Sequence, residues 1–225
     1  MPPRTGSSDA PRSFVEEARR AQIVRCTIEI IASLGYAQAS LATIAERAGI
    51  SKGVISYHFA GKDELIAQVY TSVMTMAAQR VLPVVEAQPR AQDKLRAYIE
   101  GSLAFIADHG PESIALLEIW NGLRTSAGQP VLDARSYEPG LEFLQAIFRQ
   151  GHAAGEFRRF VPRTMAVAVR SVIDGVLIQR ATYGADVDIA ESSREIVALF
   201  EAATRAVRDD ATRSKGPTRK PRAKR

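Results

Sequence analysis

Side chains that can donate hydrogen bonds gather on one segment, residues 40–62, which reads SLATIAERAGISKGVISYHFAGK. Its hydroxyl, amine, imidazole and phenol groups suit an extended polar or anionic partner, and its glycines allow a close approach of another backbone. Nine residues of this segment are our candidate contacts: Ser40, Thr43, Ser51, Lys52, Gly53, Ser56, Tyr57, His58 and Lys62. This set indicates a binding surface.

Two short helices joined by a tight turn are needed to position these groups. Ser40 is a suitable N-cap for the first helix, and Ser51 is suitable for a very short second helix over residues 52–58. Gly49, between them, can adopt the left-handed conformation that a sharp turn requires. Small or branched apolar residues pack the crossing: Ile44, Ala45, Ala48, Ile50 and Ile55. The pattern predicts a helix-turn-helix, whose second helix fits the major groove of DNA.

The segment from Ile23 to Leu65 resembles the N-terminal DNA-binding domain of the TetR family of repressors. The agreement is densest in three stretches, AGISKG at 48–53, YHF at 57–59 and KDEL at 62–65. The C-terminal part resembles the family only in its helical layout and length. The resemblance implies a homodimer on a palindromic operator, released by a small-molecule ligand.

The resemblance also implies individual roles for the candidate contacts. Ser40 and Thr43 would meet a phosphate at the start of their helix, and Lys62 would contact another. Lys52, Gly53 and Ser56 would lie against base edges. Tyr57 and His58 would contact a phosphate and the wall of the groove. The family often has a threonine where this chain has Ile55 or Ser56, so the base preference does not transfer. Tyr57 as a packing residue and His58 or Ser40 as simple helix caps stay open as alternatives.

The charge of the chain is concentrated at its C-terminus. The net charge is +5, but residues 213–225 contain seven Lys or Arg and no acid, so the rest carries −2 (5 minus 7). The high isoelectric point therefore does not by itself indicate a DNA-reading surface. The basic tail is expected either to add phosphate contacts or to be a solvated end.

Helical periodicity over most of the chain predicts an all-α protein with an N-terminal three-helix helix-turn-helix domain and a larger C-terminal bundle that dimerises. The expected division is a disordered arm (1–12), a DNA-binding domain (13–65), a ligand-binding and dimerisation domain (66–208) and a basic disordered tail (209–225). The expected helices cover residues 14–34, 41–48, 52–58, 62–82, 92–108, 111–126, 139–154, 162–183 and 188–208. Pro83 is expected to stop one helix, and Pro111, Pro139 and Pro162 are expected in first turns.

The helix predicted over residues 162–183 is apolar nearly all round, so it needs cover on both sides. A two-fold four-helix bundle formed with the next helix of each subunit would provide that cover. The candidate interface residues are Val172, Gly175, Val176, Ile196, Phe200 and Ala203. Burial inside a monomeric bundle is the alternative.

Apolar, aromatic and polar side chains mix between residues 105 and 143, as a ligand cavity requires. The candidate pocket residues are Phe105, His109, Leu117, Glu118, Trp120, Asn121, Arg124 and Phe143, with Tyr137 as a further possibility. Each aromatic residue could equally belong to the core, and Glu118 could face solvent.

These features together predict a DNA-binding repressor released by a small molecule, with a ligand-independent architectural DNA-binding protein as the alternative. An enzyme is not expected, because the three histidines lack metal-ligand spacing and no glycine-rich phosphate loop or G-x-S-x-G element occurs. We expect no metal and no cofactor. Cys26 is expected in a small core slot, and a cytoplasmic location is expected because no signal peptide or long apolar run is found.

Overall fold

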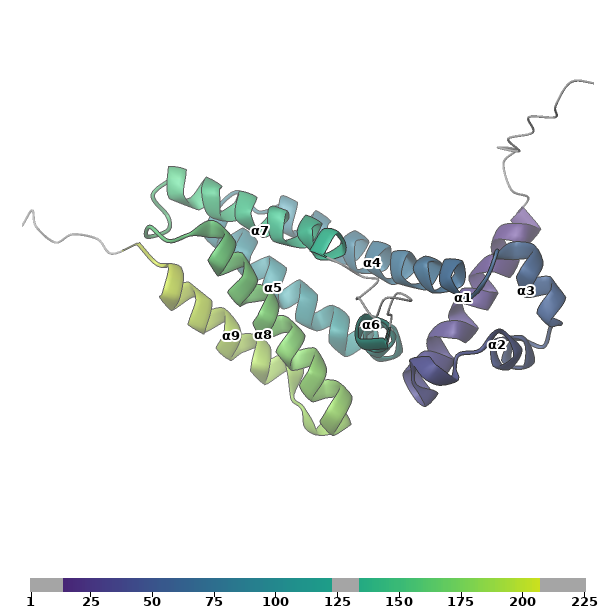
Figure 1. Cartoon of the computed structure of the whole chain (residues 1–225). Helices are drawn as coiled ribbons and strands as arrows, with labels where there is room; N and C mark the ends of the chain where they lie inside the picture. The colour runs from purple at the N-terminus through teal and green to yellow at the C-terminus, as the bar shows by residue number, and fades with distance from the viewer. Residues whose placement is uncertain (1–13, 123–133, 207–225) are drawn as a thin grey trace, which may run out of the picture.

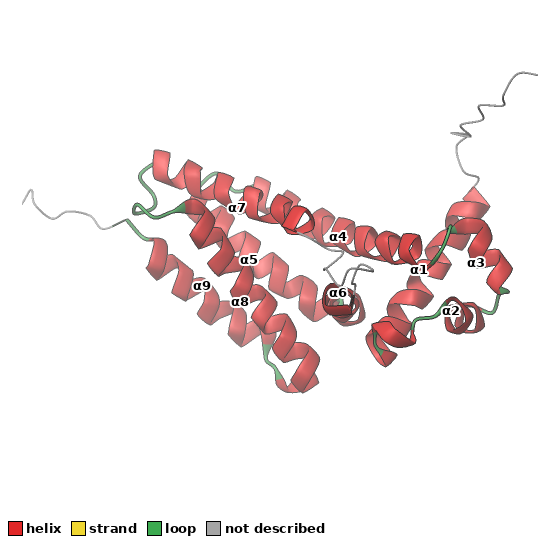
Figure 2. Cartoon of the chain, in the orientation of Figure 1, coloured by secondary structure: helices red, strands yellow, loops and turns green. Residues whose placement is uncertain are grey.

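A computed structural model of the chain describes residues 14–122 and 134–206, which are almost entirely helical (Figures 1 and 2). The helices are α1 (Phe14–Leu34), α2 (Leu41–Ala48), α3 (Lys52–His58), α4 (Lys62–Glu86), α5 (Ala91–Asp108), α6 (Gly110–Gly122), α7 (Ala134–Ala153), α8 (Pro162–Tyr183) and α9 (Ile189–Thr204), with short 3₁₀ turns η1 (Tyr36–Gln38) and η2 (Gly184–Asp186). No strand occurs in these two ranges. The all-α fold class is confirmed, and the predicted arm and tail lie outside the described residues.

The three N-terminal helices lie together at one end of the molecule, and we call this end the reading head (α1–α3). α4 begins at the head and runs into a body formed with α5, α7, α8 and α9 (Figure 1). α6 lies between the body and the head and packs along α1. The head is therefore connected to the body through two helices, α4 and α6.

The apolar core of the head continues into the body. It contains residues of α1 to α4, and also Phe105 of α5 and Ala115 and Ile119 of α6. A second core joins the far half of α4 with α5, α7, α8 and α9. The domain boundary at residue 65 stays a prediction, because one core crosses it.

Two prolines lie inside helices, although Pro83 is predicted to stop a helix and Pro139 is predicted in a first turn. α4 continues past Pro83 to Glu86, and α7 already begins at Ala134, so Pro139 lies inside it. Each proline ring is exposed and costs one backbone hydrogen bond. The apolar periodicity runs through both sites, with Val85 buried beyond Pro83, so tertiary burial outweighs the lost bond.

Smaller differences concern helix ends and faces. The last helix ends at Thr204 instead of residue 208, and the predicted end of the 111–126 helix lies outside the described residues. Leu34, the last residue of α1, extends beyond the core, and its side chain is 58% exposed. The buried face of the helix consists of Ile23, Val24, Thr27, Ile28, Ile30 and Ile31.

Candidate nucleic-acid interface and ligand site

Both helices of the helix-turn-helix have the predicted caps. The Ser40 hydroxyl accepts a hydrogen bond from the Thr43 N–H at 3.1 Å, and the Ser51 hydroxyl accepts from the Val54 N–H at 3.4 Å. Gly49 ends α2 in the left-handed conformation, with φ 65° and ψ 34°. Since no other residue type adopts that conformation as readily, Gly49 fixes the direction in which α3 leaves the turn.

One side of α3 is buried and the opposite side is free. Ile55 is buried in the core of the head, and so is Phe59, the first residue after α3. Exposed residues on the other side are Lys52, Gly53, Ser56 and Tyr57. The Tyr57 side chain is 74% exposed, which rules out the packing alternative; its hydroxyl donates to Glu16 at 3.1 Å and its ring contacts that of His58. This polar face is what a groove-reading helix requires.

Arg20 of α1 holds the end of α3 in place. Its guanidinium lies 4.0 Å over the Phe59 ring, donates to the His58 carbonyl oxygen and pairs with Glu64 at 3.4 Å. Glu64 in turn accepts a hydrogen bond from the Ala60 N–H at 2.6 Å. The turn between α3 and α4 is therefore held by one arginine and one carboxylate.

Lys62 is engaged inside the head and does not project freely. Its Nζ lies 4.4 Å over the Tyr36 ring and donates to the Tyr36 carbonyl oxygen at 3.4 Å. Burial lowers the pKa of Lys62. A phosphate contact by Lys62 stays a prediction, and such a contact requires the amine to leave Tyr36.

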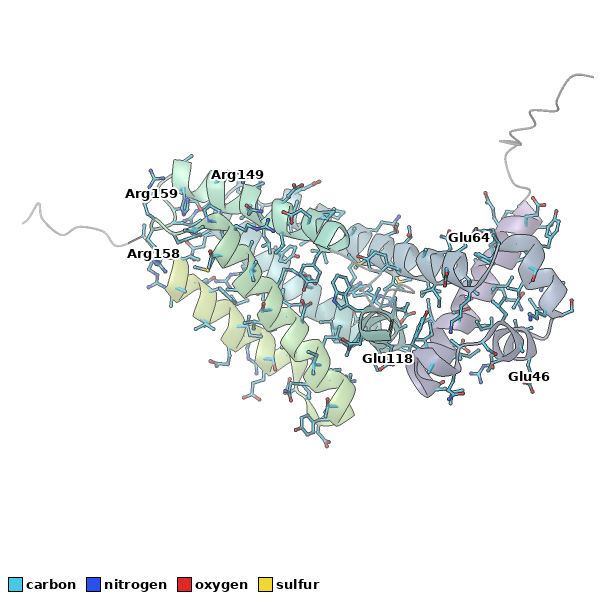
Figure 3. All side chains as sticks on the ribbon, viewed as in Figure 1. Glu46, Glu64, Glu118, Arg149, Arg158 and Arg159 are labelled. Carbon is cyan, nitrogen blue, oxygen red and sulfur yellow. The ribbon has the colours of Figure 1, made fainter. Side chains whose placement is uncertain are left out.

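Tyr36 also joins the head to α6. Its N–H donates to the Glu118 Oε2 atom at 3.4 Å, and Figure 3 shows Glu118 beside the end of α1. At Gly122 an added Cβ would lie 2.7 Å and 2.9 Å from two ring carbons of Tyr36. α6 therefore meets the head through a hydrogen bond and a close ring contact.

Aromatic rings and one ion pair lie together in the body, near the last residues of α6 and the first residues of α7. Trp120 and Tyr137 meet edge to face at 4.9 Å between ring centroids, and Tyr98 and Phe143 lie 6.0 Å apart. Arg170 of α8 connects the two pairs, since its guanidinium lies 5.4 Å over the Tyr137 ring and donates to the Tyr98 hydroxyl at 3.4 Å. We call this group, with Asp174, the aromatic–arginine cluster.

Asp174 supplies the carboxylate of the cluster. Arg170 Nη2 donates to its Oδ1 at 2.9 Å, yet burial raises the pKa of Asp174 to about 6. The side chain keeps 34% of its surface accessible. The Asp174 carboxylate is therefore crowded by protein and still partly accessible to solvent in the single chain.

Comparisons with known proteins identify the family. A family model described as bacterial regulatory proteins, tetR family, matches residues 23–69, which run from the middle of α1 through α2 and α3 into α4. HTH-type transcriptional regulator BetI 2 of Chromohalobacter salexigens is 30% identical over 190 residues, covering 81% of this chain and 86% of that protein. The chain belongs to the TetR family of transcriptional regulators. It is therefore a DNA-binding regulator and not an enzyme, as expected from the sequence.

One further relative agrees in sequence, and two solved structures agree in fold. HTH-type transcriptional regulator BetI of Stenotrophomonas maltophilia is 28% identical, over 83% of this chain and 92% of that protein. A regulator from Saccharomonospora viridis solved in complex with choline has a TM-score of 0.72 at 21% identity, over 84% of this chain and 98% of that one. FadR of Bacillus subtilis, solved with stearoyl-CoA, has a TM-score of 0.69 at 22% identity, over 81% and 97%. No helix among the described residues of this TetR regulator is long and apolar enough to cross a bilayer.

The predicted pocket residues of this TetR regulator do not lie together. Trp120 and Phe143 are in the aromatic–arginine cluster. Phe105 is buried in the core shared with the head, and His109 stacks on it at 4.6 Å, while Glu118 contacts Tyr36. The remaining three are Leu117, which is half-buried, Asn121, which is exposed, and Arg124, which lies outside the described residues.

Sequence reasoning missed Tyr98, Arg170 and Asp174 in the cluster. A signal was present for two of them, because Arg170 and Asp174 are four residues apart on a helix that is otherwise nearly apolar. Charged residues at that spacing pair on one helix face. Tyr98 gave no such signal, since nothing in its neighbourhood distinguishes it from a core aromatic.

The predicted dimer residues of the regulator divide between surface and core. Val172, Val176, Ile196 and Ala203 are half-buried in the single chain, whereas Phe200 is only 5% exposed and already packs in the core of its own protomer. A Cβ added at Gly175 would meet nothing within 4 Å. α8 and α9 also carry exposed apolar side chains, Val167, Ile178 and Leu199. The single chain thus leaves an apolar face on these helices uncovered.

We expect the variant Arg170→Met to lose stability mainly at high pH. The raised pKa means that the Asp174 carboxyl binds its proton more tightly in the folded chain than in the unfolded chain. Ionising Asp174 therefore destabilises the fold, and this cost is absent near pH 4 and complete above about pH 6. Removing Arg170 takes away the charge that favours ionised Asp174, so this penalty grows. Because the carboxylate is partly accessible, the loss at pH 8 should be about 1 kcal/mol, below that of a fully buried pair.

Urea unfolding of Arg170→Met and the unchanged chain at pH 5 and pH 8 checks this result. Asp174→Asn in the Arg170→Met background is the control, and it should remove the added pH dependence. An equal loss of stability at both pH values would contradict the assignment to Asp174.

Proposed function

We propose that this regulator is a repressor that binds a palindromic operator as a homodimer and leaves it when a small molecule binds the body. The observation that carries the proposal is the exposed polar face of α3, held on a head that shares its core with α5 and α6. The nine residues predicted from Ser40 to Lys62 are its proposed contacts. A cytoplasmic location is part of the proposal, because the operator is there.

The uncovered apolar face of α8 and α9 supports the homodimer. Exposed Val167 and Ile178 on α8 and Leu199 on α9 would lose contact with water in a four-helix arrangement of two protomers. The open space at Gly175 allows the partner helix to approach closely. Phe200, one of the predicted interface residues, is buried in the core of its own protomer. It would contribute to the dimer indirectly, by packing α9 against that core.

We propose the aromatic–arginine cluster as the ligand site. Aromatic faces attract a cation, and a cationic ligand would compete with Arg170 for the Tyr137 ring and for Asp174. This chemistry suits a small cationic molecule, and the likeness of the fold to a regulator solved with choline makes choline the first probe. An acyl-CoA, bound by the FadR neighbour, carries the opposite charge and would pair with Arg170 instead.

α6 would carry the effect of ligand to the head. Trp120 lies in the cluster, while Glu118 and Gly122 of the same helix contact Tyr36. A ligand that binds preferentially when α6 is displaced shifts the population toward heads that no longer match the operator spacing. A ligand with equal affinity for both states would leave operator binding unchanged.

The test is selection of duplexes from a random library with the full chain, followed by affinity measurements at fixed salt. We expect enrichment of a palindrome that binds two chains, and at least a tenfold loss of affinity with saturating choline, within the usual range of allosteric coupling. Selection without a palindrome would contradict the operator proposal. An effect of stearoyl-CoA but not of choline would contradict the cationic ligand, and no effect of either would favour the ligand-independent alternative.

Two variants serve as controls. Lys52→Ala changes the exposed face of α3 without touching the core, so operator affinity should fall while unfolding stays the same. Gly175→Leu adds a side chain where its own protomer leaves space, so the protomer should fold but sediment as a monomer.

A further inference from the structure

The first turn of α1 contacts the exposed side of α3. Figure 1 shows the start of α1 beside α3, and the Tyr57 hydroxyl donates to the Glu16 Oε1 atom at 3.1 Å, across 41 residues of sequence. Glu16 lies one helical turn before Arg20, which holds the end of α3 through the His58 carbonyl oxygen. Both side chains therefore leave the same face of α1, and that face meets α3.

The N-terminus of α1 does not by itself explain the position of Glu16. Both Glu16 and Glu17 lie in the first turn, where a negative charge is favourable near the positive end of the helix dipole. Glu17 is exposed to solvent, whereas Glu16 is half-buried and contacts α3. The Glu16 carboxylate therefore lies at the border of the face that we propose for DNA.

The Tyr57 hydroxyl cannot bind Glu16 and a phosphate as a donor at the same time. A phenol has one hydroxyl proton to donate, and the oxygens of a DNA phosphate accept hydrogen bonds. While this proton is donated to Glu16, the phosphate contact proposed for Tyr57 cannot form. DNA binding through Tyr57 therefore requires that the bond to Glu16 is broken first.

The charge of Glu16 opposes the same phosphate contact. A phosphate oxygen bound by Tyr57 would lie about 2.7 Å from the hydroxyl, and so at most about 6 Å from the Glu16 oxygen that is 3.1 Å from that hydroxyl. Two negative charges at this separation repel each other. Either Glu16 or Tyr57 must therefore turn away from the other when DNA is bound.

We infer that Glu16 and the DNA backbone compete for the Tyr57 hydroxyl, so that Glu16 lowers the affinity of the head for DNA. The carboxylate holds Tyr57 in the unbound head, and a phosphate replaces it in the bound head. Because a phosphate contact carries no sequence information, the cost applies equally to the operator and to unrelated duplexes. This competition depends on the proposed function for the phosphate contact of Tyr57.

The test is a double-mutant cycle on operator affinity, measured with the full chain at fixed salt. Glu16→Ala should bind the selected operator about fivefold more tightly, the factor that one net hydrogen bond contributes. Tyr57→Phe alone should change affinity by less than about twofold, because it removes the bond to Glu16 and the bond to phosphate together. In the Glu16→Ala background the same substitution should lower affinity about fivefold.

Glu17→Ala is the matched control, since it removes an acid from the same turn of α1. Its effect on affinity should be the same in the unchanged chain and in the Tyr57→Phe background, and thermal unfolding verifies that each variant is folded. A gain from Glu16→Ala that persists in full in the Tyr57→Phe background arises from charge alone and overturns the competition. A loss of affinity in Glu16→Ala also overturns it, since Glu16 would then position Tyr57 for DNA.

Failure of the operator proposal can be separated from failure of the competition. The same cycle is repeated with a duplex of unrelated sequence at about 50 mM salt, where phosphate contacts are strong. If no palindrome is selected but this duplex shows the coupling, the operator proposal fails and the competition stands. If the operator is bound and neither duplex shows coupling between residues 16 and 57, the competition fails and the operator proposal stands. Binding of neither duplex overturns both.

Discussion

Gly151→Ala should destabilise the folded chain by about 2 kcal/mol, since overpacking a filled core costs about 1–3 kcal/mol. A methyl group at Gly151 would lie under 3.0 Å from three ring carbons of Phe157. That ring is only 4% exposed and contacts Phe148 and Phe160, so it has no free space to move into. The expected fall in melting temperature is about 4–8 °C for a chain of this size.

Thermal and urea unfolding measure this effect, and Gly101→Ala is the matched control. Gly101 also lies inside a helix, but an added Cβ would be at 3.5 Å from Val81, an ordinary contact. That variant should keep or raise stability, because alanine favours a helix by up to about 1 kcal/mol over glycine. Phe157→Leu in the Gly151→Ala background should recover part of the loss. A Gly151→Ala variant as stable as the unchanged chain would refute the close packing of Phe157.

The reading head could be predicted from the sequence because its signals are local. The caps at Ser40 and Ser51 and the left-handed turn at Gly49 depend on residues within four positions of each other. The exposure of Tyr57 followed from its place on the same short helix. Lys62 was not predictable in this way, since its contact is with Tyr36, 26 residues earlier in the chain.

The aromatic–arginine cluster could not be predicted, because it depends on how helices distant in sequence face one another. α6 is apolar on nearly all sides, so its periodicity does not indicate which face meets the body. Residues two apart on a helix point about 200° away from each other. Glu118 therefore reaches Tyr36 in the head while Trp120 reaches Tyr137 in the body. The sequence named both residues but could not assign them to different surfaces.

Prediction of helix termini from prolines is limited in the same way, because it uses local signals only. Local chemistry places a proline at a helix start or just beyond its end, yet Pro83 and Pro139 lie within helices. Val81 and Val85 are buried on the two sides of Pro83, and Leu141 is buried after Pro139. This burial keeps both helices intact, and burial is a tertiary property. Pro162, with no buried turn before it, begins its helix as predicted.

Gly122→Ala should weaken operator binding by about tenfold, within the coupling range of about 5–150-fold typical of linked sites. The added methyl group would lie 2.7 Å from the Tyr36 ring and must push Tyr36 away from α6. Tyr36 contacts Lys62 through its ring and its carbonyl oxygen, and the Tyr36 N–H donates a hydrogen bond to Glu118. Displacing Tyr36 therefore shifts Lys62 at the start of α4 and the position of the head at the same time.

Fluorescence anisotropy with the selected operator at fixed salt measures this change, and thermal unfolding measures stability beside it. Stability should fall by less than in Gly151→Ala, because Gly122 is the last described residue of α6 and Tyr36 is only half-buried. Gly140→Ala is the matched control, since its added Cβ would meet only the Tyr98 hydroxyl at 3.9 Å. Replacing the ring by Tyr36→Leu in the Gly122→Ala background should recover part of the affinity. Operator affinity equal to that of the unchanged chain would show that α6 does not position the head, and the proposed route for ligand release would then fail.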